Sequence, residues 1–195
     1  MSAPSSLDAF ITKHASGLFR EAGFIRKGRV FTKDAPPLRA AAHVLKYQSR
    51  RNFNVRFSIM IPAYSDSVAI IQADLSNFAR GQTHLPEWRW PMIRSEEEVA
   101  SSLTRALCRV GLPWCERLLS ASAVYETLEA EHPSPNRAVH LSHLCEQMGK
   151  DAEALFWWRE YCEPPRAEVA PGTPAWRRLQ SLARKAGLEY EDEEA

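Results

Sequence analysis

Residues 52–61 read NFNVRFSIMI and have the clearest secondary-structure pattern in the sequence. Every second residue is apolar, and most of the residues between them are polar. The apolar positions are Phe53, Val55, Phe57, Ile59 and Ile61, which alternate with Asn54, Arg56, Ser58 and Met60. A period of two with one apolar face predicts a half-buried strand in an antiparallel sheet. Pro62 ends this strand, because proline has no backbone N–H to donate to the ladder.

Two further strands are expected on the N-terminal side of this stretch, at residues 28–33 and 41–48. The Pro36-Pro37 pair separates them, since neither proline can donate a ladder hydrogen bond. The link Arg50-Arg51-Asn52 between the second and third strands is short, which predicts a hairpin.

The segment that follows Pro62 has a less regular pattern. Residues 68–71 are typical of a strand, whereas residues 73–79 fit a helix equally well. Residues 84–92 contain two tryptophans and two prolines with no clear period, and a loop that could include an edge strand is expected there.

A helix is expected over residues 7–21 at the start of the chain. Apolar residues recur there at steps of three and four, which places them on one face. Ser6 is the expected N-cap, and Gly23 lies where a left-handed residue commonly ends a helix.

The C-terminal half is expected to be helical. Ser95 followed by Glu98 forms a capping box, and Gly111, Gly149 and the Pro133 and Pro135 region act as breakers. Pro113, Asn136 and Thr173-Pro174 mark the starts of new helices. The expected helices cover residues 95–110, 113–131, 136–148, 151–163 and 173–185, and an acidic tail follows at 189–195.

These elements predict an α+β protein. A small antiparallel sheet of about three to five strands would pack against the N-terminal helix and a helical C-terminal half. The expected division is a core domain over residues 1–131 and a helical hairpin extension with an acidic tail over residues 132–195, packed on the core as one unit.

Composition places the chain among ordinary globular proteins. Its 195 residues are 45% hydrophobic and 25% charged, and no apolar run approaches the roughly 18 residues that span a bilayer. The N-terminal residues lack the blocks of a signal peptide, so a cytoplasmic protein without membrane contact is expected. Reduced thiols are expected at Cys108, Cys115, Cys145 and Cys162.

No motif in the sequence points to catalysis, a metal or a cofactor. The spacing of His140, His143 and Cys145 matches no common zinc pattern, and these residues do not converge well on a helix. Neither a Gly-x-Ser-x-Gly elbow nor a Gly-rich phosphate loop is present. The chain is therefore expected not to be an enzyme, although a site built from scattered residues stays open.

Charge is unevenly distributed, and this bears on binding partners. Residues 1–60 hold 11 Lys and Arg against 3 Asp and Glu, whereas residues 61–195 hold 14 against 21. Basic and aromatic residues on a sheet can bind nucleic acid, but a solvated outer face or a surface for an acidic protein also fits. The candidate binding residues are Arg29, Arg50, Arg51, Arg56, Trp88 and Trp90.

Tryptophan is common both in binding hot spots and in cores. Of Trp88, Trp90, Trp157 and Trp158, at least two are expected in the core.

Several short motifs resemble one bacterial family, the domain of unknown function 4304. Ala22–Thr32 (AGFIRKGRVFT) resembles the block that enters the family's small antiparallel sheet. Residues 44–48, 53–61, 85–92 and 111–114 are similar to its later strands, tryptophan loop and helical turn, so the likeness covers roughly residues 5–130. The family brings no established activity. Small domains of this kind occur beside secreted polymorphic toxins, where they act as immunity proteins.

Residues 141–161, LSHLCEQMGKDAEALFWWREY, resemble a single tetratricopeptide-type hairpin within residues 136–163. Gly149 would form the turn, and Ala154 would let the two helices approach closely. A generic antiparallel helix pair fits the same residues, and stable repeat arrays need about three units.

Two functional hypotheses follow. The first is a non-enzymatic protein-binding domain, in its sharpest form an immunity or antitoxin-like inhibitor of a cognate toxin. The alternative is a nucleic-acid-associated protein that binds through the basic sheet face of residues 20–56, with an affinity that falls steeply with salt.

Overall fold

The computed structural model describes residues 6–47, 52–65, 68–76, 95–130, 135–162 and 170–188. The chain divides into two compact units, Met1–Ser120 and Ala121–Ala195. The first unit contains a sheet and helices and the second is helical, which confirms the predicted α+β fold class with a helical C-terminal half.

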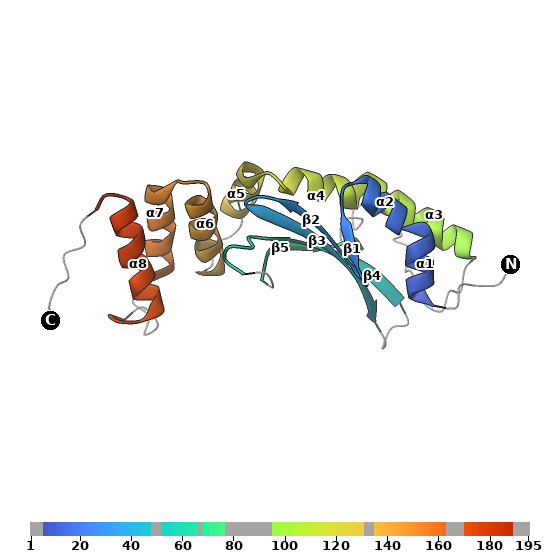
Figure 1. The fold of residues 1–195 in the computed structure, drawn as a ribbon, viewed down its shortest axis with the longest axis horizontal. Coiled ribbons are helices and arrows are strands. Elements are labelled where there is room, and N and C mark those ends of the chain that lie inside the picture. Colours follow the sequence, from blue (N-terminus) through green and yellow to red (C-terminus); the bar gives the residue numbers. More distant parts are fainter. Residues whose placement is uncertain are drawn as a thin grey trace. The chain divides into compact units, whose positions relative to one another are not determined.

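The first unit contains one antiparallel sheet in which each strand pairs with the next along the chain (Figure 1). The expected strand over residues 52–61 is confirmed as β4. The strand expected over residues 68–71 is confirmed as β5, which continues to Asp74, whereas residues 77–79 of the helix that was the alternative lie outside the described residues. The strands are β1 (Ile25–Lys27), β2 (Val30–Ala35), β3 (Leu38–Tyr47), β4 (Asn52–Met60) and β5 (Ala69–Asp74).

Two tight turns connect the first three strands. The strand expected from Gly28 begins at Val30 instead, because Gly28 lies in the turn between β1 and β2 with φ of 63°, a conformation that favours glycine. Pro36 and Pro37 form the turn between β2 and β3, where Ala35 pairs with Leu38. The Pro-Pro break is therefore the two-residue loop of a hairpin.

Helices α1 (Leu7–His14), α2 (Ser16–Glu21), α3 (Glu96–Ala106) and α4 (Leu112–Leu118) lie on one side of this sheet (Figure 1). We call the sheet face toward them the inner face. Phenylalanine rings form much of the contact: the ring centroid of Phe19 lies 4.1 Å from that of Phe31 and 6.4 Å from that of Phe57. The ring of Phe10 meets that of Phe53 at 5.9 Å. The apolar half of the alternation in β4 is therefore the floor of the core.

The N-terminal helix is divided in two, which the sequence prediction of one helix over residues 7–21 had wrong. The backbone departs from helical geometry at Ala15, where φ is −118°, and the Ser16 hydroxyl donates to the carbonyl of Ile11. Ser6 caps α1 as predicted, since its hydroxyl accepts a hydrogen bond from the Ala9 amide at 3.2 Å.

Gly111 does not break the helix that begins after Ser95, contrary to the sequence prediction. The helix continues from α3 through one π-helical turn, Leu107–Gly111, into α4. The wider turn suits Pro113, which has no N–H to donate and whose ring would crowd a regular turn. A Cβ at Gly111 would lie 2.6 Å from the Phe57 ring, so glycine is needed here for close packing on the sheet.

The helix expected to run to residue 131 ends at Leu118, and α5 (Ala121–Glu129) follows after a short turn. The capping box at α3 is confirmed, because the Ser95 hydroxyl accepts from the Glu98 amide and Glu98 accepts from the Ser95 amide.

The second unit contains α5, α6 (Pro135–Gln147), α7 (Asp151–Cys162) and α8 (Pro174–Lys185). Gly149 has φ of 70° and forms the turn between α6 and α7, and the buried Ala154 lies on α7, as expected for a close helix pair. Helix α6 begins one residue before Asn136, so this residue lies in its first turn rather than at the cap. Thr173 caps α8 as predicted.

An arginine joins the three long helices of this unit. The Arg178 guanidinium of α8 lies 2.9 Å from a carboxylate oxygen of Glu146 on α6 and 4.8 Å from the ring centroid of Trp158 on α7. Trp157 and Trp158 are both buried, which confirms the expectation of at least two core tryptophans. None of the described helices is long and apolar enough to span a lipid bilayer.

Candidate functional site

Two of the six candidate binding residues lie in the described part of the chain, and both are in ion pairs. Arg29 donates two hydrogen bonds to the carboxylate of Asp8, at 2.6 and 2.7 Å. Arg56 donates to Asp74 at 2.7 and 3.3 Å. The other four candidates, Arg50, Arg51, Trp88 and Trp90, lie outside the described residues.

The Asp8 pair changes the acidity of its carboxyl group. The hydrogen bonds and positive charge of Arg29 lower the pKa of Asp8 below its usual value of 3.8. Because Arg29 lies in the turn between β1 and β2 and Asp8 lies in α1, this pair joins the sheet to the first helix. This ion pair therefore gives Arg29 a structural role.

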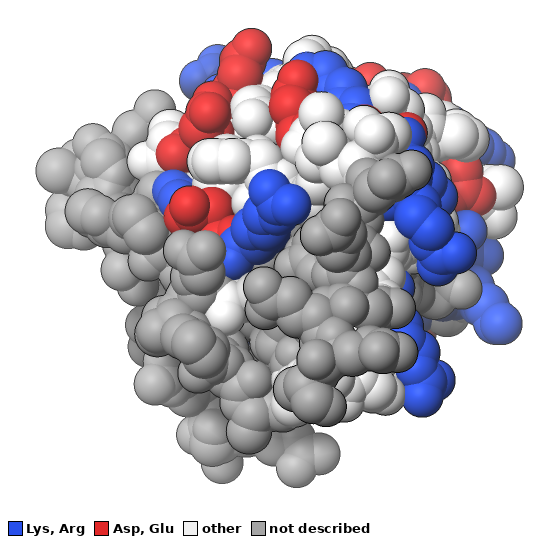
Figure 2. Space-filling model, turned by 90° about the vertical axis from the view of Figure 1, so that its left-hand side faces the viewer, with Lys and Arg blue, Asp and Glu red and all other residues white. Residues whose placement is uncertain are grey.

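Several other cations of the basic front are also compensated locally. Lys33 binds Glu116, and Arg39 binds Asp34 on the neighbouring strand. Basic and acidic side chains are interspersed on the face of the molecule that Figure 2 draws. The first unit nevertheless has a net excess of positive charge, with 17 Lys and Arg against 10 Asp and Glu, whereas the second has 8 against 14. The excess therefore comes from cations other than these four.

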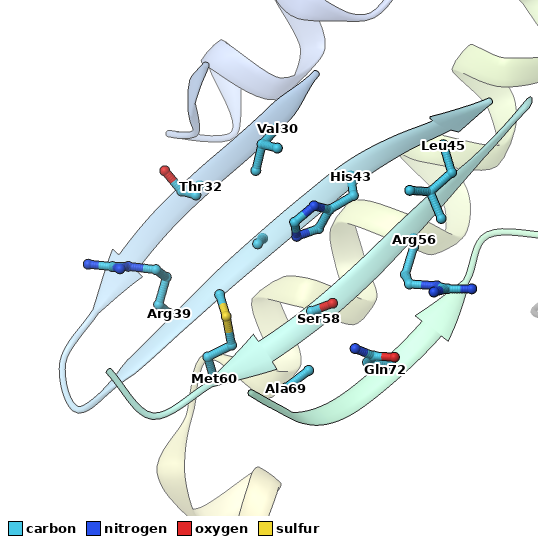
Figure 3. A pocket seen from close by; sticks show the side chains of 11 residues that line it. Val30, Thr32, Arg39, His43, Leu45, Arg56, Ser58, Met60, Ala69 and Gln72 are labelled. Atoms are coloured by element: carbon cyan, nitrogen blue, oxygen red, sulfur yellow. The ribbon is translucent and has the colours of Figure 1, made fainter. Parts of the chain in front are cut away.

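The most distinctive feature of the first unit is a hollow on the sheet face opposite the helices, which we call the outer face (Figure 3). The register of the strands explains its floor. Thr32 of β2 pairs with Ala41 of β3, Ala41 pairs with Ser58 of β4, and Ser58 pairs with Gln72 of β5. A row with short side chains at three successive positions therefore crosses the sheet, and Ala41 and Ser58 are only 1% and 3% exposed.

Longer side chains form rows on both sides of this floor. One wall is the cross-strand row Val30, His43, Arg56 and Asp74, and the other is the row Asp34, Arg39, Met60 and Ala69. Each row is two residues from the floor, so the walls lie about 14 Å apart at roughly 3.4 Å per residue. We call this hollow the outer-face slot, and its volume is about 440 Å³.

Ion pairs hold opposite corners of the outer-face slot. Arg39 and Asp34 close it at the β2–β3 end of one wall, and Arg56 and Asp74 close it at the β4–β5 end of the other. Figure 3 shows the side chains of Arg39 and Arg56 on either side of the labelled Ser58. Because each guanidinium faces a carboxylate, the walls carry little net charge.

Four polar side chains that line the outer-face slot make no hydrogen bond within the described part of the chain. They are Thr32, His43, Ser58 and Gln72. Ser58 is the most informative, because only 3% of this residue is exposed and its hydroxyl nevertheless makes no hydrogen bond within the described chain. The slot therefore offers hydrogen-bonding groups that a ligand could satisfy.

His43 contributes an uncharged imidazole to this set. Burial lowers its pKa below the usual 6.5, and the nearby positive charge of Arg56 lowers it further. A neutral imidazole has one nitrogen that donates and one that accepts a hydrogen bond. The slot is thus suited to a neutral ligand that contains both apolar and polar groups.

The arrangement of Ser58 and His43 does not resemble a nucleophile–base pair. His43 is paired with Arg56, so Ser58 is its diagonal neighbour, and such neighbours have Cβ atoms roughly 7–8 Å apart. Activation of a serine hydroxyl requires a hydrogen bond to the base, with heavy atoms within about 3.2 Å. This geometry favours binding over nucleophilic chemistry at the slot.

Metal binding finds no support among the described side chains, where no cluster of three His, Cys, Asp or Glu residues could hold an ion. Burial lowers the pKa of His143 to about 4, and this ring lies against Trp158 at 6.1 Å. The four cysteines form no disulfide within the described chain, and burial raises the pKa of Cys115 and Cys145 to about 12. These two thiols are therefore poor nucleophiles.

Sequence reasoning identified Arg56 but missed the outer-face slot. The short residues of its floor come from three strands and are far apart in the sequence, so only the strand register brings them into one row. One sign of the slot was present in the sequence. Ala41 and Ser58 are small residues on neighbouring strands, at positions that face away from the core.

Comparison of the chain with protein-family models gives no match, and comparisons with curated proteins and with solved structures give none either.

Proposed function

We propose that the chain is a protein-binding domain and that the outer-face slot receives a side chain of its partner. The observation that carries this proposal is a set of polar side chains, Ser58 above all, that have no hydrogen-bond partner in the described chain and surround a hollow of about 440 Å³. A partner that reached these groups would gain hydrogen bonds in place of those to water.

The lining predicts the chemistry of the inserted side chain. Apolar surface comes from Val30, Ala41, Leu45 and Met60, and the free polar groups carry no net charge. The two arginines face aspartates, so an anionic side chain would compete with an existing ion pair. We expect an uncharged side chain with an apolar body and a polar end, such as tyrosine or glutamine.

Affinity capture with the tagged full chain tests this function. Extracts of the native host would be applied at low and then moderate salt, and the bound fraction identified by mass spectrometry. One stoichiometric protein that remains bound at moderate salt and binds again after purification supports the proposal. If no captured protein binds the chain directly after both are purified, the proposal is contradicted.

In its finer form, the proposal is that the chain is an immunity or antitoxin-like inhibitor of a bacterial toxin. Its support is the resemblance of residues 22–32 to family 4304 and the charge excesses of opposite sign in the two units, which can accelerate association. Co-expression with the captured partner tests it. The inhibitor hypothesis requires that the partner alone arrests growth and that the chain restores it.

Nucleic-acid binding is the second candidate, and the positive excess of the first unit favours it. Exposed Lys27 and Lys46 have no carboxylate partner in the described chain, whereas Arg29, Lys33, Arg39 and Arg56 do. Binding to a labelled single-stranded oligonucleotide at increasing salt tests it. A steep fall in affinity supports this function, and no binding at low salt removes it.

We also propose a reducing, cytoplasmic location. Its support is the state of the cysteines. Within the described chain no disulfide joins any of Cys108, Cys115, Cys145 and Cys162, and Cys115 and Cys145 are completely buried. Thiol titration of protein isolated from cells under acid quench tests this location, and fewer than four reactive thiols after denaturation would contradict it.

A further inference from the structure

A second hollow lies between the first two helices and the β1–β2 hairpin, and it shares no lining residue with the outer-face slot. We call it the Arg26 groove, and its volume is about 640 Å³. Two features distinguish it: an arginine whose position is fixed by neutral groups, and an apolar floor. Its lining residues are Thr12, Lys13, Ser16, Gly17, Arg20, Phe24, Ile25, Arg26 and Phe31.

Three hydrogen bonds fix the guanidinium of Arg26. Its Nε donates to the carbonyl of Gly28 at 2.8 Å, and its Nη1 donates to the hydroxyl oxygens of Thr12 and Ser16 at 2.7 and 2.8 Å. Both hydroxyls donate their own protons to main-chain carbonyls of α1, so their oxygens can only accept from the arginine. The guanidinium is therefore held rigidly before any ligand binds.

These contacts leave the charge of Arg26 without a counter-ion. All three acceptors are neutral, and the Nη2 atom has no hydrogen-bond partner in the described chain. The charge of Arg26 helps to lower the pKa of the Asp8 carboxyl group, but Arg29 already binds this carboxylate through both oxygens. An arginine held in this way can bind an oxyanion without breaking an ion pair.

The rest of the groove adds positive charge and no negative charge. None of its described lining residues is acidic, and Arg20 is exposed on α2 without a carboxylate partner in the described chain. Lys13 is the third cation, but its ammonium lies 2.8 Å from Glu96. Arg20 and Arg26 therefore supply the uncompensated charge.

The apolar side of the groove lies directly beside this charge. Phe31 is under the Arg26 guanidinium, 5.5 Å from ring centroid to Cζ, and Phe24 contributes a second buried ring. Ile25 on the edge strand is 75% exposed and extends the apolar surface outward. A ligand here would place an apolar group against these residues and an oxyanion against Arg26.

We propose that the Arg26 groove binds a small organic oxyanion, in which a carboxylate or phosphate is joined to an apolar body. The oxyanion accepts hydrogen bonds from Nη2 of Arg26 and pairs with Arg20. The apolar body covers Phe24 and Ile25. This site is independent of the protein-binding function proposed for the outer-face slot.

Titration of the full chain with four probes tests the proposal. Benzoate and phenyl phosphate carry both features, benzamide lacks the charge, and inorganic phosphate lacks the apolar body. Binding would be followed by changes in the nuclear magnetic resonance signals of the Arg26 Nε–H and the Ile25 amide. We expect benzoate or phenyl phosphate to bind at least tenfold more tightly than the other two, and the preferred one of the pair identifies the oxyanion.

Matched variants connect the binding to these residues. Arg26→Gln and Arg20→Gln should each weaken binding about tenfold or more, which is the scale of one lost charge-assisted hydrogen bond. Arg105→Gln removes an exposed arginine of α3 and should leave affinity unchanged. If Arg26→Gln does not fold, Arg26→Lys keeps the charge, loses Nη2, and should still weaken binding.

Three results would overturn the proposal. The first is no saturable binding of benzoate or phenyl phosphate at millimolar concentration. The second is equal affinity for benzamide, or for inorganic phosphate. The third is an affinity that falls equally in Arg105→Gln and Arg20→Gln, because that pattern would mean a general response to net charge.

Discussion

The two faces of β4 come from one alternating stretch of sequence, yet they serve different purposes. On the inner face, Phe57 is fully buried and touches Phe19 and Trp114. On the outer face, Ser58 is almost as buried but has no hydrogen-bond partner in the described chain. Burial alone therefore does not distinguish a core residue from a site residue. The distinction lies in whether the buried groups are satisfied by the fold itself.

The largest effect on stability is expected for Phe57, on the inner face of β4. Phe57→Ala should lower the free energy of unfolding by about 3–5 kcal/mol, because it empties the centre of the core. Ser58→Ala should change it by less than about 0.5 kcal/mol, since no bond within the fold is lost. Urea unfolding followed by circular dichroism measures both. A large loss in Ser58→Ala would mean that this hydroxyl has a structural role.

Gly111 tests how closely the inner face is packed. Gly111→Ala should cost about 1–3 kcal/mol, because the new Cβ would meet the Phe57 ring at 2.6 Å. The matched control is Gly17→Ala in α2, where no atom lies within 4 Å of a new Cβ. This control should stabilise the protein by about 0.4–1 kcal/mol. Thermal unfolding of both variants gives the comparison, and an equal sign for the two would contradict the packing argument.

The Arg56–Asp74 pair of the outer face should contribute less than the core contacts. The two side chains are 39% and 20% exposed, so solvent screens their attraction. A double-mutant cycle with Arg56→Met and Asp74→Asn should give a coupling of about 0.2–1 kcal/mol that declines with salt. A coupling several times larger would make the slot wall a structural element rather than a recognition surface.

The smallest effect is expected from the protonation of His43. The pKa of His43 is below 6.5 in the folded chain and about 6.5 in the unfolded chain. At pH values between these two pKa values, the unfolded chain binds more protons than the folded chain. Stability should therefore fall as the pH drops below about 6.5. His43→Gln should reduce this loss, as measured by urea unfolding at pH 7 and pH 5. A measured His43 pKa of 6.5 in the folded chain would mean no contribution to the pH dependence, and a higher pKa would reverse its sign.

Much of the α+β fold could be predicted from local patterns. The period of two in residues 52–60, the Ser95 and Glu98 capping box and the turn at Gly149 each depend on neighbouring residues only. Gly111 was misread because its role is a contact with Phe57, which lies 54 positions earlier in the sequence. A sequence pattern cannot distinguish a glycine that ends a helix from one that permits close packing.

The candidate site was less predictable for the same physical reason. The sequence shows Arg29 and Arg56 as positive charges. It does not show which carboxylates neutralise them, because these lie 21 and 18 positions away in the sequence. The outer-face slot depends on the register of four strands, and a shift of one residue would move Ser58 to the other face. Sites of this kind become visible only when the strand pairing is known.

The most direct test of the central claim is to fill the outer-face slot and measure partner binding. Isothermal titration with the purified captured partner would compare the wild-type chain, Ser58→Phe and the control Ser101→Phe on the exposed surface of α3. We predict at least a 100-fold loss of affinity for Ser58→Phe, with its fold retained by circular dichroism, and no change for Ser101→Phe. Equal affinity of a folded Ser58→Phe and the wild type would contradict the claim that the slot is the binding site.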